Sequence, residues 1–405
     1  MKTYGKRGGR RLPYWAVIIV VVAVYAAWCL ARPLPQLSPT VSLTHDTSVT
    51  ASKLAWPAGA QAAVGVLNSS IMEAHGVQQP IPTASTAKLI TALTVLGAKP
   101  LTPGEQGPTL TMGPSDVAIY NNYVAQDGSV VRVQNGEQIS EYQALETLML
   151  PSANNMADSL AIWAFGSLQN YAQAANQFLE SEGIVETHVG KDASGFDPST
   201  TSDARDLVKI GELAMRNPVL TQIVSQSTAN GIPVVGTVKN VNFLLGTNGI
   251  IGIKTGNTDE AGGVFVSASK TTVNNKPVTI VTAVIGAADL WHAMNDSLAL
   301  VKSAQANFST VPVVRAGAVV GSYKLPWGGS VKAIAAKDIS TTVWNGSDPS
   351  PKADLKKIKA NSAAGSPVGT VSTASSFVSN QASAPVTLQS TPAEPPISWR
   401  LSHPF

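Results

Sequence analysis

The chain is short of cysteine and of charge. It has 405 residues, one cysteine (Cys29) and only 13% charged residues, while hydrophobic residues make up 44%. Charged residues usually take about a quarter of a globular chain. Because Cys29 lies inside an apolar run near the N-terminus, no disulfide can form within the rest of the chain. The composition excludes a disordered chain, and the length allows two folded domains.

Basic charge is also scarce outside the first residues. The formal net charge is +3, and five positive charges precede residue 12: Lys2, Lys6, Arg7, Arg10 and Arg11. Subtracting these five from +3 leaves a net charge of −2 for the remainder. A nucleic-acid-binding surface needs a basic excess, so we expect no nucleic-acid partner.

A long uncharged run follows the basic cluster. Residues 12–31 carry no charge and are about as long as a helix that crosses a bilayer. The basic side of such a helix stays in the cytosol. We therefore expect a cytosolic segment over residues 1–13, a transmembrane signal-anchor helix over 14–31 and an extracytoplasmic chain after Arg32. A cleaved signal peptide is the alternative, although the run exceeds the usual signal core of roughly 7–15 residues.

The remainder divides into a linker, a mixed region and a β-rich region. Residues 32–57 are rich in Pro, Ser and Thr and predict a linker that lifts the folded part off the membrane. Apolar spacing then predicts helices and β-branched runs predict strands. The expected helices begin near Ser85 and cover 141–165, 168–183, 204–216 and 290–306; the expected strands cover 62–68, 71–76, 249–256, 262–269 and 278–286, the last two antiparallel.

Short strand-like pieces follow Phe308. They are separated by Gly, Pro, Ser and Asp, a spacing typical of a small β-sandwich. The Ser- and Ala-rich stretch from Ser362 to Ser383 could instead form a loose tail. The mixed region therefore ends near residue 308, and a C-terminal β-rich domain covers residues 309–405.

Ser85 and Lys88 lie three residues apart in the first turn of an apolar helix, so they share one face. A serine nucleophile needs a base, and a lysine can act as one if burial lowers its pKa from about 10.4. Backbone N–H groups at a helix N-terminus also favour a developing oxyanion. The pair alone fits equally well a helix-start serine beside a lysine with a buried stem. Ser267 and Lys270 have the same spacing, but in a strand, where the side chains diverge.

Two further motifs add to this pair. Ser152 and Asn154 stand at a Pro-marked break in an apolar segment, where a hydroxyl and an amide can face one cavity; a polar turn between two helices is the alternative. Lys254, Thr255 and Gly256 end an apolar strand. A hydroxyl and a positive charge can bind a carboxylate, and a glycine lets backbone approach a ligand. An edge strand with a charged residue is the alternative there.

The order SxxK, SxN and KTG is much more specific than any one motif, and it occurs in class A β-lactamases and penicillin-binding proteins. The chain resembles the serine D-alanyl-D-alanine carboxypeptidases, the low-molecular-mass penicillin-binding proteins. Segments in that family's order cover most of Ala62 to Phe308. They are PTASTAKLITAL, LMLPSANNMADSLA, DASGFDPSTTSDARDLVKIGELA, NVNFLLG and GIKTGNTDEAGGVFVSA.

The chain departs from the family pattern at three places. Asn155 stands where many relatives carry Asp, and Asn257 follows KTG where His or Tyr is common. Neither change removes a catalytic group. Many relatives end in an amphipathic membrane-binding helix, whereas three prolines in PPISWRLSHPF exclude a long helix here. The N-terminal span can replace that anchor.

The resemblance implies a fold and a location. It implies an α/β (α+β) catalytic domain over residues 58–308, with a mainly antiparallel sheet flanked by helices and a helical lobe, which is the penicillin-binding/β-lactamase-like transpeptidase fold. The small C-terminal β-sandwich domain follows. The protein would be held in the bacterial cell membrane by one span, with its catalytic domain outside. Its partners would be peptidoglycan stem peptides ending in D-Ala-D-Ala, and β-lactam antibiotics as covalent inhibitors.

The resemblance also implies catalytic roles. Ser85 would attack the carbonyl between two D-alanines, Lys88 would be the base, and Ser152 would pass a proton to the leaving amine. The backbone N–H groups of Ser85 and Asn257 would form the oxyanion hole. No metal or other cofactor is needed.

The substrate-binding residues follow from the same resemblance. Asn154 would hold the donor peptide's amide, and Lys254 would add positive potential. Thr255 would bind the terminal carboxylate, and Gly256 and Asn257 would line the same strand.

Three other functions fit parts of the pattern. A D,D-endopeptidase that cuts cross-links is a close chemical relative. A class A β-lactamase would use a Glu to activate water, but no ExxLN-like segment lies between the SxN and KTG motifs. A non-catalytic wall-binding module is the third, although every motif residue is present.

Overall fold

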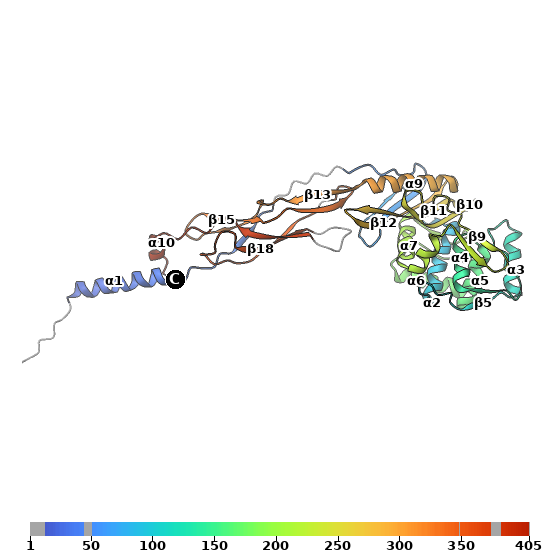
Figure 1. The fold of residues 1–405 in the computed structure, drawn as a ribbon, viewed down its shortest axis with the longest axis horizontal. Coiled ribbons are helices and arrows are strands. Elements are labelled where there is room, and N and C mark those ends of the chain that lie inside the picture. Colours follow the sequence, from blue (N-terminus) through green and yellow to red (C-terminus); the bar gives the residue numbers. More distant parts are fainter. Residues whose placement is uncertain (1–12, 44–50, 348, 374–381, 405) are drawn as a thin grey trace, which may run out of the picture.

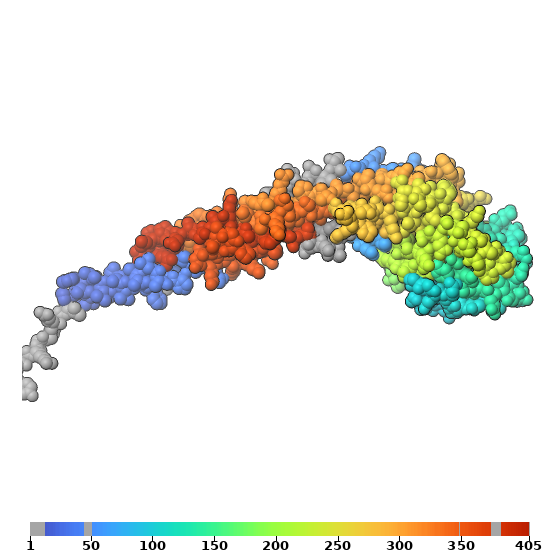
Figure 2. Space-filling model, viewed as in Figure 1, coloured from blue at the N-terminus to red at the C-terminus, as the bar shows by residue number. Residues whose placement is uncertain are grey.

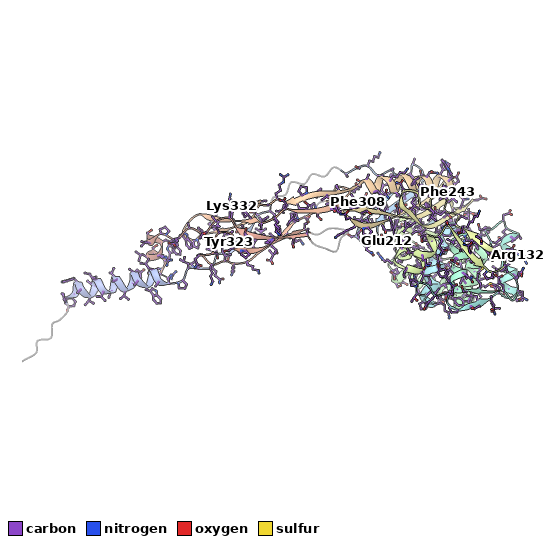
Figure 3. All side chains as sticks on the ribbon, viewed as in Figure 1. Arg132, Glu212, Phe243, Phe308, Tyr323 and Lys332 are labelled. Carbon is purple, nitrogen blue, oxygen red and sulfur yellow. The ribbon has the colours of Figure 1, made fainter. Side chains whose placement is uncertain are left out.

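The computed structural model describes residues 13–43, 51–347, 349–373 and 382–404 and has an elongated shape (Figure 1). Helix α1 (Tyr14–Ala31) lies at one end and a mixed helix-and-sheet domain at the other, with a β-rich domain between them (Figure 2). Figure 3 marks Tyr323 in the β-rich domain, Phe308 at the junction and Arg132 at the far end. The basic cluster from Lys2 to Arg11 lies outside the described residues.

A five-stranded antiparallel sheet forms the centre of the mixed domain. Its strand order is β10 (Ile250–Thr258), β11 (Gly262–Val273), β12 (Lys276–Ala287), β2 (Gln61–Val66) and β3 (Met72–His75). The expected hairpin of β2 and β3 and the antiparallel pair of β11 and β12 are confirmed. Asn274 and Asn275 both take positive φ in the turn between β11 and β12, a conformation that Asn tolerates.

Both faces of this sheet are buried. Side chains alternate between the two faces of a strand, and a different helix covers each face. Val264 and Val266 on β11 belong to one apolar cluster with helix α7 (Ala204–Arg216). Phe265, between them, belongs to a second cluster with helix α9 (Leu290–Ala306). The predicted helices at these two positions are confirmed, and the Asp203 side chain caps α7 by accepting from the Asp206 N–H at 2.7 Å.

The remaining helices form a lobe beside the sheet. They are α2 (Ala87–Ala98), α3 (Pro114–Val124), α4 (Glu141–Met149), α5 (Asn154–Phe165), α6 (Leu168–Ser181) and α8 (Pro218–Val224). The prediction of one helix over 141–165 is wrong. The chain breaks at Pro151, and Ser152 takes φ +66°, which excludes a continuous helix.

Several elements were not expected from the sequence. Helix α3 lies between the helix expected near Ser85 and the one expected from residue 141, where no helix was predicted. Helix α8 follows directly on Asn217, whose side chain caps it. A hairpin of β8 (Thr228–Ile232) and β9 (Gly236–Lys239) follows α8. Two short strand pairings also belong to the mixed domain: β4 (Ile81–Pro82) with β7 (Thr201–Ser202) and β5 (Thr109–Thr111) with β6 (Gln138–Ser140). The 3-10 turn η2 (Thr247–Gly249) precedes β10.

Two sheets share one core in the C-terminal domain, as expected for a sandwich. The larger sheet has the order β1 (Pro39–Val41), β14 (Val319–Lys324), β15 (Ser330–Ala335), β19 (Ala382–Leu388), β18 (Pro367–Thr373) and β17 (Lys352–Leu355); the smaller pairs β13 (Phe308–Val314) with β16 (Ile339–Trp344). The alternative of a loose tail over 362–383 is wrong for its described part, because β18 is paired on both sides.

The expected linker over residues 32–57 is also structured in part. Strand β1 pairs with β14, and Leu37 is 1% exposed in the core of the C-terminal domain. Part of the linker is therefore folded into the C-terminal domain, because the open edge of a distant sheet supplies backbone partners for β1. A short helix, α10 (Ile397–Ser402), contacts the end of α1, where Arg400 donates to the Leu30 carbonyl at 2.6 Å.

Candidate active site

Ser85 and Lys88 occupy the first turns of one helical segment. The 3-10 turn η1 (Ala84–Thr86) leads directly into α2, which starts at Ala87. The Lys88 Nζ lies 2.8 Å from the Ser85 Oγ. Lys88 is fully buried, while Ser85 is half-buried. The serine is therefore accessible to a substrate, and the amine behind it is shielded from water.

The other two contacts of Lys88 orient its amine. The Nζ lies 2.7 Å from the Asn154 Oδ1 and 2.9 Å from the Ser194 carbonyl oxygen. Both atoms only accept hydrogen bonds, so each of them accepts one N–H of the Lys88 amine. In a neutral amine the remaining position is the lone pair, which then points at the Ser85 hydroxyl. This geometry suits a base that removes the proton of Ser85.

The surroundings of Lys88 favour the neutral amine. Burial lowers the pKa of Lys88 from its ordinary value to about 7, and the negative charges of Asp192 and Asp158 oppose that shift. A general base works best when its pKa is close to the ambient pH. The pKa of Lys88 therefore suits the general-base role that the SxxK motif predicts.

The break between α4 and α5 brings the second motif to the same place. Asn154 is the first residue of α5, and its Oδ1 accepts from Lys88. Ser152, at the break itself, accepts a hydrogen bond of 2.8 Å from the Lys254 Nζ. The Lys254 Nζ also donates to the Thr255 carbonyl oxygen at 3.0 Å. Burial, together with the positive charge of Lys88, holds the pKa of Lys254 well below its ordinary value.

Strand β10 runs against the turn that carries Ser85. A Cβ atom at Gly256 would lie 3.1 Å from the Ser85 N and 3.1 Å from the Thr83 carbonyl oxygen. Thr255, 4% exposed, precedes it on the strand. Asn257 is exposed, and its side-chain oxygen accepts from the Leu290 N–H at 3.0 Å, so only its backbone is available for the role expected of it.

The structure thus brings the three motifs together and leaves the second SxxK match apart. Ser267 is buried and its hydroxyl pairs with Thr282 at 2.8 Å, while Lys270 is exposed. Asn155, where relatives carry Asp, forms two backbone hydrogen bonds with Val131, at 2.9 and 3.0 Å. An amide can donate and accept at once, which explains why Asn is suitable there.

Sequence reasoning missed four buried polar residues beside Lys88: Tyr123, Asp158, Asp192 and Ser194. Asp158 follows Asn154 by one helical turn, a spacing that places both on one face of α5. That spacing was the available signal. Within the described residues, no group of three His, Cys, Asp or Glu side chains could hold a metal ion.

A serine that faces a buried lysine, beside a second pair formed by Ser152 at the α4–α5 break and Lys254 on β10, is typical of serine enzymes that form an acyl intermediate. The fold is that of the penicillin-binding enzymes. The chain belongs to the peptidase S11 family, described as D-alanyl-D-alanine carboxypeptidase, whose family model matches residues 47–289.

Individual proteins agree with this family. The chain is 26% identical to the D-alanyl-D-alanine carboxypeptidase DacA of Escherichia coli (strain K12) over 289 residues, which is 69% of this chain and 67% of that protein. It is 26% identical to the D-alanyl-D-alanine endopeptidase of the same strain over 250 residues, or 60% of this chain and 76% of that protein. Penicillin binding protein 5 from Haemophilus influenzae has a similar fold, with a TM-score of 0.58, 23% identity and coverage of 85% of this chain and all of that one.

Proposed function

We propose that this protein is a penicillin-sensitive serine D,D-carboxypeptidase that removes the terminal D-Ala from peptidoglycan stem pentapeptides during cell-wall maturation. The observation that carries the proposal is the 2.8 Å contact between the Ser85 hydroxyl and the Lys88 amine. Family membership supports the substrate class. We also propose the domain limits given above, 58–308 for the catalytic domain and 309–405 for the β-rich domain.

Acylation begins with proton transfer from the Ser85 Oγ to the neutral Lys88 Nζ. The Oγ attacks the carbonyl carbon between the two D-alanines, and a tetrahedral oxyanion forms. The backbone N–H groups of Ser85 and Asn257 receive that oxyanion. Because Gly256 lies against η1, the two N–H groups belong to neighbouring segments.

Collapse of this intermediate expels the last D-Ala as an amine, which needs a proton. Ser152 gives its hydroxyl proton to this amine and takes in return the proton that Lys88 received from Ser85, so Lys88 is neutral again. The Lys254 Nζ, 2.8 Å from the Ser152 Oγ, orients that hydroxyl. Asn154 holds the peptide amide, and the Thr255 hydroxyl donates a hydrogen bond to the terminal carboxylate of the leaving D-Ala. Water then attacks the acyl-enzyme and frees Ser85. A β-lactam acylates the same oxygen, and its leaving amine stays tethered to the acyl group.

A D,D-endopeptidase activity on cross-linked peptides is the second candidate. The similarity to the Escherichia coli endopeptidase covers 76% of that protein. The two activities differ in whether the leaving group ends in a free carboxylate. Comparison of a pentapeptide monomer with a cross-linked dimer as substrates separates them.

We propose that α1 anchors the protein in the bacterial cell membrane with the folded domains outside. Within the described residues, α1 is the one helix long and apolar enough to cross a bilayer, with a mean hydropathy of 2.3. Protease added to intact spheroplasts should then degrade the domains after Arg32. Protection of these domains, or a mature N-terminus near Arg32, would contradict an uncleaved anchor of this orientation.

The experiment for the catalytic proposal is intact-mass measurement after incubation with a penicillin, together with assay of D-Ala release from a pentapeptide. We expect one covalent adduct on Ser85 and D-Ala release. Ser85→Ala should lose both while its melting temperature stays unchanged, because a half-buried hydroxyl contributes little to stability. An adduct that persists in Ser85→Ala would exclude Ser85 as the nucleophile.

A further inference from the structure

A cluster of buried polar side chains adjoins the Lys88 amine and has no role in the mechanism above. Tyr123, Asp158, Asp192 and Ser194 are 5%, 6%, 8% and 0% exposed. They come from α3, from α5 and from the turn at residues 192–197. Two carboxylates in so buried a place are costly unless they are well bonded, so their hydrogen bonds define what the cluster does.

Asp192 holds the turn together. Its carboxylate accepts from the Ser194 hydroxyl and from the backbone N–H groups of Gly195, Phe196 and Asp197, at 3.3, 2.9 and 3.3 Å for the three N–H groups. With the Tyr123 hydroxyl, which lies 3.4 Å from the Asp192 Oδ2, five donors face this carboxylate and fix the shape of the turn. The Ser194 carbonyl, which receives Lys88, is part of this turn.

Asp158 ties the same turn to α5. Its Oδ1 accepts from the Ala193 N–H at 2.9 Å, and its Oδ2 accepts from the Tyr123 hydroxyl at 2.7 Å. The Tyr123 ring packs edge-on against Phe196, with 5.6 Å between ring centroids. Asp158 therefore holds Ala193, just before Ser194, and Tyr123 holds the Phe196 side chain, two positions after it.

The turn also reaches the segment that carries the nucleophile. A Cβ atom at Gly195 would lie 2.0 Å from the Ala84 carbonyl oxygen, so only glycine allows this approach. Ala84 immediately precedes Ser85. One turn thus positions the carbonyl that binds the Lys88 amine and packs against the backbone next to the Ser85 hydroxyl.

We propose that Asp158 is a positioning residue for Lys88: with Tyr123 and Asp192 it holds the Ser194 carbonyl against the amine and keeps a negative charge beside it. The inference rests on the proposed function, since it assumes that Lys88 is the base for acylation. Asp158 itself contacts neither the nucleophile nor the substrate and acts through the turn and through its charge.

The charged and titratable side chains around the Lys88 amine come from every neighbouring element. They are Tyr123 on α3, Asp158 on α5, Tyr171 on α6, Asp192 on the turn and Lys254 on β10. Burial favours a neutral Lys88 amine, while the two carboxylates favour a charged one. Burial also raises the pKa of Asp158 to about 6, so its negative charge is present where Lys88 titrates, near 7. Without the two carboxylates the pKa of Lys88 would lie below its value of about 7. Because an amine with a lower pKa is a weaker base, the carboxylates preserve the basicity of Lys88.

The test is the rate of penicillin acylation as a function of pH, in the full-length protein and in Asp158→Asn. In this variant the side-chain amide oxygen can still accept from the Ala193 N–H, and the amide NH₂ group can donate a hydrogen bond to the Tyr123 hydroxyl oxygen. The fold should therefore persist. Loss of the charge lowers the pKa of Lys88. We expect the acid limb of the rate profile to move to lower pH by about half a unit or more, and the rate at high pH to fall because the base is weaker.

Two further variants make the test specific. Glu212→Gln changes another buried carboxyl, on α7, which pairs with Arg216 and has a pKa raised to about 7, so it is charged only at the high-pH end of the profile; it should leave both the acid limb and the rate at high pH unchanged. Asp192→Asn removes the same sign of charge but points an NH₂ group at backbone N–H donors, so it should move the limb in the same direction and also lower the rate at every pH. It serves as the second measurement if Asp158→Asn does not fold.

The outcomes separate the two proposals. A rate that falls uniformly in Asp158→Asn and Asp192→Asn, with the acid limb unmoved, would mean that the cluster is only structural and would overturn this inference. Absence of acylation in the unmodified protein would instead overturn the proposed function. A limb that moves equally in Glu212→Gln would show that any change of a buried carboxyl moves it and would also contradict a specific role for Asp158.

Discussion

The Lys254 amine donates a hydrogen bond of 2.8 Å to the Ser152 hydroxyl, across 102 positions of sequence and between two buried side chains. This bond joins the loop between α4 and α5 to strand β10. Since burial and Lys88 lower the pKa of Lys254, the amine can exchange a proton with the hydroxyl instead of acting only as a fixed charge.

The first prediction follows from this contact. Ser152→Ala removes the hydroxyl that relays a proton to the leaving amine, and we expect peptide acylation to fall by about 10²-fold or more, the usual contribution of a positioned proton donor. Rapid-quench measurement of the acyl-enzyme checks this. Ser267→Ala, which changes another buried hydroxyl, should leave the rate nearly unchanged; equal rates in the two variants would exclude a relay through Ser152.

Replacement of Lys88 by arginine tests the base. Arginine keeps the positive charge but does not become neutral in proteins, so Lys88→Arg should acylate slower by orders of magnitude. Lys270→Arg is the matched control, because Lys270 has the same SxxK spacing and is exposed. Normal penicillin labelling of Lys88→Arg would contradict the general-base role without affecting the family assignment.

Gly256 offers a test of the close approach between β10 and η1. A Cβ there would meet three atoms at 3.1 Å, two of them backbone atoms of Thr83 and Ser85. Backbone cannot move aside cheaply, so Gly256→Ala should displace the strand from the nucleophile and lower acylation at least about 10-fold, since small misplacements are costly in catalysis. Gly97→Ala, at a position with nothing within 4 Å, should have no effect on acylation. Similar acylation rates in both variants would show that this approach is unimportant.

Thr255→Val tests recognition of the carboxylate. The hydroxyl donates to a charged group, and loss of such a bond costs about 1.5–3 kcal/mol, or roughly 10- to 150-fold in rate. Valine keeps the β-branched shape that suits a strand. Hydrolysis of a D-Ala-D-Ala peptide should therefore slow much more than hydrolysis of the same peptide with an amidated terminus. If the unmodified protein and the variant share one acid-to-amide preference, Thr255 does not bind the carboxylate, and the endopeptidase candidate gains support.

Glu212 predicts a pH dependence of stability. Burial raises the pKa of its carboxyl from 4.5 to about 7, and Arg216 opposes the shift. The folded protein therefore binds this proton more tightly than the unfolded chain does. That contribution to stability is complete below pH 4.5 and is lost as the pH rises through about 7.

Glu212→Gln should consequently match the unmodified protein in melting temperature at low pH and exceed it above neutrality, because the amide has no charge to bury. Scanning calorimetry at both pH values measures the difference. A variant that is less stable than the unmodified protein above neutrality would show that the Arg216 pairing outweighs the cost of burial.

Much of the site could be predicted from the sequence because its contacts are local. Ser85 and Lys88 share a helical face through their spacing, and Ser152 stands at a break that Pro151 marks. The spacing of Asn154 and Asp158 carried similar information that went unused. The bond between Ser152 and Lys254 had no local signal, since it depends on how β10 packs against the lobe.

The errors in the fold have physical reasons of the same kind. Helix α3 buries only Tyr123, so its apolar residues do not follow a single buried face, and its position depends on tertiary contacts such as the Tyr123–Asp158 hydrogen bond. Residues 39–41 lack a strand pattern of their own because their partner, β14, lies far along the chain. The helix expected over 141–165 was too long because apolar spacing continues across a backbone break.

The pairing of β1 with β14 has a consequence for biosynthesis. Pro39 is made among the first residues, but its partner Tyr323 is made only after the whole catalytic domain. Since domains fold as units while the ribosome proceeds from the N-terminus, β1 must wait as an unpaired segment until the chain is almost finished. The C-terminal domain can therefore close its sheet only after residues 319–324 are made, and a chain terminated before residue 319 would keep residues 39–41 without their strand partner.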